Sequence, residues 1–238
     1  MRFLVTRPEP DASRTARALR LRDHEVILSP AIRIETIDVC LPREGLQAVI
    51  VTSANAVRAL AVHHELASLQ HLPLFSVGDR TALEAHHLGF ASVESADGAA
   101  ADLTRLIRDR LDPAGGPLLY LAADRRAAPL DEELAEFGFS VILKEIYRSL
   151  AVHTLTQAAE AALADADPLG ILLYSARSAA AFARAAETAR LLPLKQSATL
   201  FCLAEPVAAP LRNLAEGPIL VANRPTEASL FELIEGRQ

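Results

Sequence analysis

Residues 49–60 read VIVTSANAVRAL, and residues 171–182 read ILLYSARSAAAF. Each stretch is a short apolar run that ends in a Ser-Ala pair, beginning at Ser53 or Ser175, and continues as small residues with helical spacing. This pattern predicts a buried parallel strand that turns directly into a helix. The first N–H groups of such a helix point beyond the end of the strand, where they can bind an anion. The two copies predict two anion-binding turns in one molecule.

The composition is that of an ordinary globular protein, because 51% of the 238 residues are apolar and 23% are charged. The net charge of −6 argues against nucleic acid as a partner. Two cysteines cannot form a disulfide framework, so we expect free thiols in a reducing compartment. The sequence shows neither a secretory signal nor an apolar run long enough to span a membrane, which predicts a cytoplasmic protein without membrane contact.

Short apolar runs alternate with helical patterns along the whole chain, which is typical of an α/β fold with parallel sheets. The first helix should begin at a cap formed by Asp11 or Ser13. The expected strands cover residues 3–6, 25–28, 46–51, 74–77, 92–94, 118–121, 140–143, 171–174, 199–203 and 219–221. The expected helices cover residues 11–22, 54–63, 79–89, 101–110, 129–137, 156–164, 176–182, 207–214 and 227–234.

Two segments alternate strictly between apolar and polar residues, at 32–39 and at 145–155. Alternation predicts exposed antiparallel strands instead of strands covered on both faces. If the two segments pair, the chain crosses between domains twice through ribbon linkers near 32–39 and 145–153. One domain would then combine residues 1–34 and 153–238, and the other would comprise residues 35–152.

The two halves of the chain contain similar blocks in the same order. Residues 4–26 match residues 119–141 at a constant offset of 115, and the block FSVGDRTAL at 75–83 resembles FCLAEPVAA at 201–209. Residues 101–107 likewise resemble residues 228–234. All strand-helix units look alike to some degree, but the shared order of the blocks favours two similar units.

The sequence motifs of nucleotide-binding proteins and common hydrolases are absent: the chain has no GxGxxG, Walker, GxSxG or HExxH sequence. The adjacent pairs His63-His64 and His86-His87 point in different directions on a helix, so we expect surface residues and no metal site. No Ser/His/Asp set stands out. Any catalysis would therefore depend on positioning and on backbone dipoles.

Several short motifs together resemble the uroporphyrinogen-III synthase family. The motifs are VTRP at 5–8, TSANAV at 52–57, Val77-Gly78 followed by Thr81-Ala82, Gly138 and Val141 leading to Tyr147, YSARS at 174–178 with Phe182, and Pro225-Thr226 before the last helix. The matches run from residue 3 to about residue 234, so the resemblance covers nearly the whole chain.

The resemblance implies two similar parallel-sheet domains, flavodoxin- or Rossmann-like, joined by a two-stranded β-ribbon hinge with the active site between them. It implies a lyase of porphyrin and heme biosynthesis that converts hydroxymethylbilane, a linear tetrapyrrole polycarboxylate, into uroporphyrinogen III. Water is lost and the last pyrrole ring is inverted, through a proposed spirocyclic intermediate. The family further implies a monomer that uses no cofactor.

Carried over residue by residue, the resemblance implies one catalytic side chain and a set of substrate-binding residues. Tyr147 matches the tyrosine proposed to assist departure of the hydroxyl group, although a tyrosine packed in the ribbon is the structural alternative. The implied substrate-binding residues are Arg7, Ser53, Ala54, Asn55, Gly78, Thr81, Ser175, Arg177 and Ser178. Helix capping for the hydroxyl groups and surface charge for the arginines are the alternatives.

The chain departs from the family at the second glycine turn, which here reads AEPVA at 204–208. Val207 replaces a family threonine, so a side-chain hydroxyl is not required at that position. Either a backbone N–H binds there or the site is supported differently. Glu205 would be unexpected beside an acidic substrate unless its side chain points away.

Two other functions are compatible with parts of the sequence. The first is a non-catalytic, hinge-closing protein that binds an anionic small molecule, because it too would need a ribbon and a polar cleft. The second is an α/β enzyme that uses a nucleotide, and the missing phosphate-loop sequences count against it.

Overall fold

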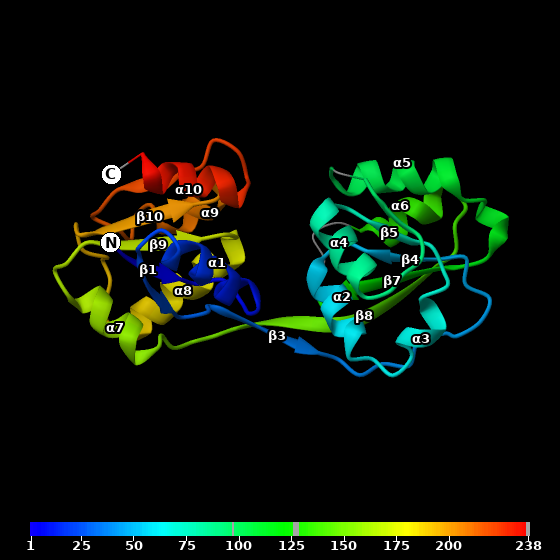
Figure 1. The fold of residues 1–238 in the computed structure, drawn as a ribbon, viewed down its shortest axis with the longest axis horizontal. Coiled ribbons are helices and arrows are strands. Elements are labelled where there is room, and N and C mark those ends of the chain that lie inside the picture. Colours follow the sequence, from blue (N-terminus) through cyan, green and yellow to red (C-terminus); the bar gives the residue numbers. More distant parts are fainter. Residues whose placement is uncertain (97, 126–128, 237–238) are drawn as a thin grey trace. The chain divides into compact units, whose positions relative to one another are not determined.

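The apolar runs form the strands of two separate sheets, and the chain divides accordingly into two units. Unit 1 comprises Met1–Arg33 and Leu150–Gln238, and unit 2 comprises Ile34–Ser149 (Figure 1). The structure is a computed structural model that describes residues 1–96, 98–125 and 129–236. Two units with mainly parallel sheets confirm the predicted fold class.

Unit 1 contains a five-stranded parallel sheet in the order β11-β10-β9-β1-β2. Its elements are β1 (Arg2–Val5), α1 (Asp11–Arg20), β2 (Glu25–Leu28), α7 (Gln157–Ala164), β9 (Leu169–Leu173), α8 (Ala176–Thr188), β10 (Ala198–Cys202), α9 (Glu205–Ala208), the 3-10 turn η2 (Ala209–Leu211), β11 (Ile219–Val221) and α10 (Glu227–Glu235). Every residue of β9 and β10 is buried, as expected for central strands covered by helices on both faces.

Unit 2 contains a six-stranded sheet in the order β3-β8-β7-β4-β5-β6. Its elements are β3 (Ile32–Thr36), β4 (Ala48–Val51), α2 (Ala54–Ala61), α3 (Leu66–Leu69), β5 (Leu74–Ser76), α4 (Asp79–His87), β6 (Val93–Ser95), α5 (Ala100–Arg110), the 3-10 turn η1 (Pro113–Gly115), β7 (Leu118–Ala123), α6 (Leu130–Glu136) and β8 (Val141–Ala151). The pairs from β8 to β6 are parallel.

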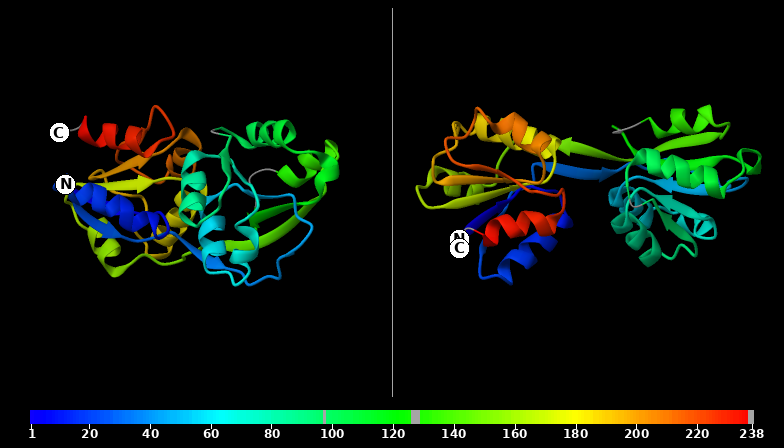
Figure 2. Two further views of the ribbon diagram at one scale, coloured as in Figure 1. Left: turned by 45° about the vertical axis from the view of Figure 1, so that its right-hand side comes forward. Right: turned by 90° about the horizontal axis from the view of Figure 1, so that it is seen from above.

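Helices cover both faces of each sheet. In unit 1, α1 and α10 share one apolar cluster with Phe3 and Phe201, and Figure 2 shows these two helices together on one face. In unit 2, α2, α3 and α4 pack against the face that contains Val49 and Val51. Helices α5 and α6 pack against the opposite face, around Ile50 and Tyr120.

The sheet registers confirm the internal repeat. In unit 1, Val5 pairs with Leu28 and with Leu172. The residues 115 positions after Val5 and Leu28 are Tyr120 and Leu143, and these two pair in unit 2. Leu172 likewise corresponds to Ile50, which pairs with Tyr120. The spatial order β8-β7-β4-β5-β6 therefore repeats the order β2-β1-β9-β10-β11, and only the order along the chain differs.

The two alternating segments pair with each other, as predicted. The N–H of Ile37 donates to the carbonyl of Ile146, and the N–H of Val152 donates to the carbonyl of Ala31. Rising numbers on one segment thus meet falling numbers on the other, which makes the pair antiparallel. The division between the units falls within these strands, after Arg33 and after Ser149.

Three local expectations were wrong. Residues 140–143 and the second ribbon segment form one continuous strand, β8, because its first half adds to β7 while it also pairs with β3. Pro10 occupies the N-cap position of α1, and the carboxylate of Glu9 instead accepts the N–H of Ser13 at 3.0 Å. In place of the helix expected at 207–214, the short helix α9 ends at Ala208 and the 3-10 turn η2 follows it. Pro210 in η2 has no N–H group to donate to an α-helical hydrogen bond.

Over the described residues, no helix combines the length and the apolar character that crossing a membrane requires.

His24 should make unit 1 sensitive to acid. Its side chain is buried against Phe3, with ring centroids 4.9 Å apart, and its enclosed Nε2 atom has no hydrogen-bond partner among the described residues. Burial lowers the pKa of His24 below its usual value of 6.5, and the N-terminal amine and Arg22 add to this effect. Because the folded pKa is depressed, the folded state favours the neutral ring. Its stabilising contribution is present above the unfolded pKa and is lost as the pH falls through the folded pKa.

We therefore expect a His24→Phe variant to lose less free energy of unfolding between pH 7.5 and pH 5 than the wild type loses. Urea denaturation at the two pH values measures the difference. The exposed His86, changed to Phe, is the control and should follow the wild type. An acid-induced loss in His24→Phe equal to that of the wild type would contradict the assignment.

Candidate functional site

The strand order of each unit creates one topological switch point, where neighbouring strands continue into helices on opposite faces of the sheet. In unit 1 this point lies between β1 and β9, and in unit 2 between β7 and β4. Ligands of open α/β sheets bind beyond the carboxyl ends of the strands at such a point. Ser175 follows β9, and Ser53 follows β4. The sheet topology therefore puts both Ser-Ala turns where this fold binds ligands.

The two Ser-Ala turns have nearly the same backbone conformation. Ser53 has φ −150° and ψ 140°, and Ser175 has φ −149° and ψ 150°. The Ser53 hydroxyl accepts the N–H of Asn55 at 3.2 Å, and the Ser175 hydroxyl accepts the N–H of Ser178 at 3.1 Å. Both serines cap a helix that begins at the next residue. The predicted change from buried strand to helix is thus confirmed in both copies.

The residues around Ser175 divide into exposed and enclosed groups. Ser178 is buried, and its hydroxyl lies 2.8 Å from the Ser175 hydroxyl, so the two side chains form one hydrogen-bonded pair. Arg177 lies in the first turn of α8 and is exposed. Helix N–H groups with a cationic side chain nearby are an arrangement that can bind an anion, so anion binding at this turn stays a prediction.

The turn at Ser53 connects directly to an ion pair between two helices. Ala54 is the first residue of α2, and the side-chain oxygen of Asn55 accepts a hydrogen bond from Arg58 at 3.0 Å. Arg58 in turn donates to the Glu84 carboxylate at 2.8 Å. The Asn55 side chain is therefore held by the link between α2 and α4.

Gly78 occupies the N-cap position of α4, and Thr81 lies in the first turn of that helix. Gly78 has an extended backbone, and a Cβ atom added there would meet nothing within 4 Å, so packing does not demand a glycine. Its missing side chain instead leaves the N-terminus of α4 open to approach. Thr81 is buried, and its N–H donates to the Gly78 carbonyl at 2.9 Å.

The counterpart of this turn in unit 1 has the same backbone conformation but no side-chain hydroxyl, because Val207 stands where unit 2 has Thr81. Ala204 is extended like Gly78, and the N–H of Val207 donates to the Ala204 carbonyl at 3.0 Å. The Val207 side chain is buried, where an apolar residue packs without needing a hydrogen-bond partner. Glu205 is exposed and accepts a hydrogen bond from Nε of Arg212 at 3.1 Å. Both departures from the family pattern thus leave the backbone turn intact.

Arg7 contacts several groups of unit 1. Its guanidinium donates to Glu227 at 2.8 Å and to Thr15 at 3.2 Å, approaches Asp11 at 3.5 Å and lies 4.0 Å from the centre of the Tyr174 ring. Only 9% of the residue is exposed. Its expected role as a direct ligand of substrate carboxylates stays a prediction, because any such carboxylate would compete with Glu227.

Tyr147 lies in the core of unit 2 and is 6% exposed. The register of β7 with β8 shifts between Ala122, which faces Glu145, and Ala123, which faces Tyr147. This bulge turns Ile146 and Tyr147 inward together, although strict alternation would put them on opposite faces. The alternation predicted for the second ribbon segment is therefore interrupted at Tyr147.

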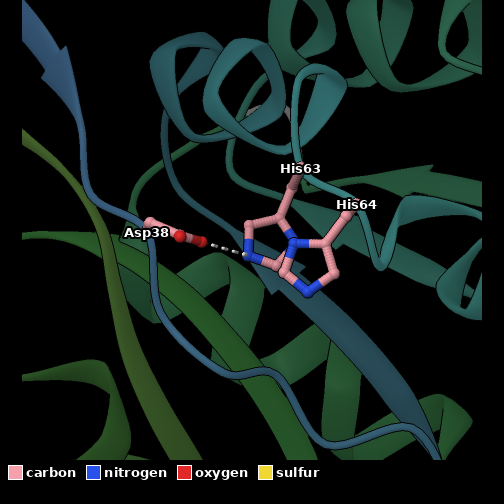
Figure 3. A group of neighbouring side chains, drawn as sticks. All are labelled: Asp38, His63 and His64. Atoms are coloured by element: carbon pink, nitrogen blue, oxygen red, sulfur yellow. Dashed lines mark ion pairs between the residues drawn. The ribbon is translucent and has the colours of Figure 1, made fainter.

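Asp38, His63 and His64 lie close together beyond the end of β3, with the Asp38 carboxylate 3.9 Å from Nε2 of His63. Figure 3 shows Asp38, His63 and His64, whose possible metal-ligand atoms lie within 4.8 Å of one another. The two imidazole rings stack with centroids 4.6 Å apart and planes at 20°, so their lone pairs do not converge on one ion. The structure therefore shows no preformed metal geometry in this cluster.

The nitrogen atoms of His63 are already used within unit 2. Nε2 lies 2.9 Å from the Val39 carbonyl, and Nδ1 accepts the N–H of Glu65 at 3.2 Å, so both ring nitrogens have a backbone partner. The expectation that both histidines lie on the surface was wrong for His63, which is 7% exposed. The ring turns inward because it satisfies these two backbone groups. His64 is exposed, as predicted.

Sequence reasoning missed Glu227, whose contacts connect Arg7, Thr15 and Tyr174. The motif Pro225-Thr226 marks the start of α10, and Glu227 follows it directly. Its pairing with Arg7, 220 residues away, has no local sequence signal.

The family model for Uroporphyrinogen-III synthase HemD matches residues 13–232. The chain is similar to the crystal structure of uroporphyrinogen-III synthetase from Helicobacter pylori 26695, with a TM-score of 0.68, 20% identity and 100% of both chains covered. It is also similar to a mutant uroporphyrinogen III synthase from the extremely thermophilic bacterium Thermus thermophilus, with a TM-score of 0.55, 18% identity, and 99% of this chain and 98% of that chain covered. Curated proteins gave no match.

The capping role of Ser175 leads to a stability prediction. Removing the hydroxyl in Ser175→Ala should lower the free energy of unfolding by about 1 kcal/mol, because one helix N–H loses its acceptor. Ser175→Asp should keep stability near that of the wild type, since a carboxylate caps the helix and favours its positive end. Urea denaturation of both variants measures this, with the exposed Ser140→Ala as control. A Ser175→Ala variant as stable as Ser140→Ala would rule out the cap as a source of stability.

Proposed function

The chain belongs to the uroporphyrinogen-III synthase family, and from this we propose that it converts hydroxymethylbilane into uroporphyrinogen III, acting as a monomer without a cofactor. In this reaction the C–O bond of the terminal hydroxymethyl group breaks and the hydroxyl leaves as water. The last pyrrole forms two new carbon–carbon bonds, its former bond to the neighbouring bridge carbon breaks, and the proton on its free α-carbon is lost, so that the ring closes with this pyrrole inverted. The product differs from the substrate by one water molecule, so no oxidant or reductant is needed.

The observation that carries this proposal is the pair of matching turns at the two switch points. The substrate is a flexible polycarboxylate, and it must be held folded so that its ends can join. Helix N-termini present N–H groups and a positive partial charge to carboxylates. The turns at Ser53 and Ser175 have almost the same backbone angles and supply one helix N-terminus for a carboxylate in each unit. The first turn of α4, which follows Gly78 and contains Thr81, supplies a further carboxylate-binding position in unit 2.

The chemistry asked of this chain is mainly positioning. Holding two reacting ends in contact can supply a large part of a rate enhancement without any reactive side chain. Backbone N–H groups also keep their orientation during the reaction, so they stabilise developing negative charge at little cost in reorganisation. Val207 replaces a family threonine, and its N–H still donates to the Ala204 carbonyl. The turn conformation is therefore kept without the side-chain hydroxyl, which agrees with a role for the backbone.

We assign Tyr147 the role of assisting departure of the hydroxyl group. A phenol can donate a hydrogen bond to the leaving oxygen, which then departs as water. The bulge beside Tyr147 supports the assignment, because bulges redirect side chains and are enriched next to active sites. The competing role is packing, since the ring belongs to the apolar cluster of unit 2.

Product analysis tests the proposed reaction directly. Freshly prepared hydroxymethylbilane is incubated with the protein, and the products are oxidised and separated by isomer. The synthase should yield the type III isomer at a rate proportional to protein concentration. The type I isomer alone, which forms spontaneously, would refute the proposal. Tight binding of the bilane without type III product would instead favour the non-catalytic binding protein.

Tyr147→Phe separates the chemical role of this residue from its packing role. The variant keeps the ring, so unit 2 should stay folded and KM should change little. We expect kcat to fall by about 100-fold or more, the lower end of the range that a positioned proton donor contributes. Steady-state kinetics with type III product as readout checks this. Unchanged kcat would remove Tyr147 from the mechanism and leave it as a core residue.

A further inference from the structure

The carboxylate of Glu227 gathers four donors at the switch point of unit 1. Its Oε1 atom accepts hydrogen bonds from Arg7 at 2.8 Å, from the Thr15 hydroxyl at 2.5 Å and from the Tyr174 hydroxyl at 3.0 Å. Its Oε2 atom accepts one from Arg14 at 3.1 Å. These partners come from the segment after β1, from α1 and from the end of β9. A single side chain at the start of α10 therefore ties together the segments on both sides of the switch point.

Two of the four donors around Glu227 are buried, Tyr174 is half-buried and Arg14 is exposed. Thr15 is fully buried and Arg7 is 9% exposed. Burial also raises the pKa of Tyr174, so its hydroxyl remains a hydrogen-bond donor to the carboxylate. Charge-assisted hydrogen bonds in such surroundings are short and well oriented. The network therefore holds its members in one arrangement.

The charges within the network cancel. Arg7 and Arg14 are positive, and Asp11 and Glu227, which pair with them, are negative. A site that binds a polyanion is expected to carry an excess of positive charge. The balance indicates that this cluster positions the neighbouring turn, and a substrate carboxylate that bound Arg7 would have to compete with Glu227.

Tyr174 transmits the position of the network to the turn. It directly precedes Ser175, whose hydroxyl caps α8. One face of the Tyr174 ring lies under the Arg7 guanidinium at 4.0 Å, and its hydroxyl is bound by Glu227. With the ring fixed at both places, the backbone at Ser175 is held at the angles that its twin, Ser53, also adopts.

We propose that Glu227 is a positioning residue that holds the Tyr174-Ser175 turn in its ligand-binding arrangement, a role that rests on the proposed function. It acts through Tyr174 and Arg7 and does not touch the substrate. Loss of the carboxylate should release the Tyr174 ring, loosen the cap of α8 and weaken substrate binding at this turn. The chemical step should be affected less than binding.

The test compares Glu227→Gln and Glu227→Ala with Glu232→Gln. Glu232 lies on the same helix, is exposed and approaches Arg224 only at 3.8 Å, so it controls for charge loss on α10. We expect Glu227→Ala to raise KM for hydroxymethylbilane about tenfold, comparable to losing a hydrogen bond to a charged group. The change in kcat should be smaller. Glu227→Gln, which keeps an acceptor oxygen, should fall between Glu227→Ala and the wild type.

Hydrogen–deuterium exchange supplies a readout independent of activity. The amide of Ser178, which donates to the Ser175 hydroxyl, should exchange faster in both Glu227 variants than in Glu232→Gln. If Glu227→Ala fails to fold, Glu227→Gln carries both measurements. Values of KM and of Ser178 exchange that match those of Glu232→Gln would overturn the proposal, even if stability falls. A wild type without type III product would refute the proposed function, whereas faster exchange in the variants would still support positioning.

Discussion

The structure depends on one constraint, which is that each strand of a parallel sheet must leave the sheet at its carboxyl end and return by way of a helix. This constraint collects every strand-to-helix turn of a unit at the same edge of its sheet. The turns after β1, β9 and β10 share an edge in unit 1, and those after β4, β5 and β7 share an edge in unit 2. Residues far apart in sequence, such as Arg7 and Ser175, thus come to neighbouring strand ends. The backbone N–H groups that make these edges attractive to carboxylates come with the topology and need no special side chain.

The two sheets have matching strand pairs, but the matching strands come in a different order along the chain. The matching pairs make the internal repeat detectable in the sequence, and the different order makes its offset change. Phe75 corresponds to Phe201, and the pair Ile50–Phe75 of unit 2 repeats the pair Leu172–Phe201 of unit 1. The β1-α1-β2 block comes first in unit 1, whereas its counterpart β7-α6-β8 comes last in unit 2. The offset between matching blocks therefore shifts along the chain. The same rearrangement puts the two crossings between units next to each other, where β3 and β8 can pair.

Local patterns predicted the elements well and the side-chain contacts poorly. Apolar runs followed by small residues predicted both Ser-Ala turns, because a buried strand and a helix N-cap each have a short-range signature. Alternation also predicted the ribbon pair. The sequence could not indicate that His63 would turn inward to bind Val39, nor that a bulge would bury Tyr147 beside Ile146. Both depend on backbone groups that become neighbours only after folding. The pairing of Arg7 with Glu227 could not be predicted either, because the two side chains come together only in the folded chain.

The repeat also shows where the two units have diverged in a way that bears on ligand binding. Matching sheet registers put Ala122 of unit 2 where unit 1 has Arg7, and Thr52 where unit 1 has Tyr174. The matching helices likewise put Ala100 in the position of Glu227. Unit 2 therefore reaches the same turn geometry with different support, in which the Thr52 hydroxyl lies 3.2 Å from the Tyr120 hydroxyl. Because equal backbone angles arise from unlike surroundings, the conformation of the turn is the common requirement. The side chains that stabilise it were free to differ.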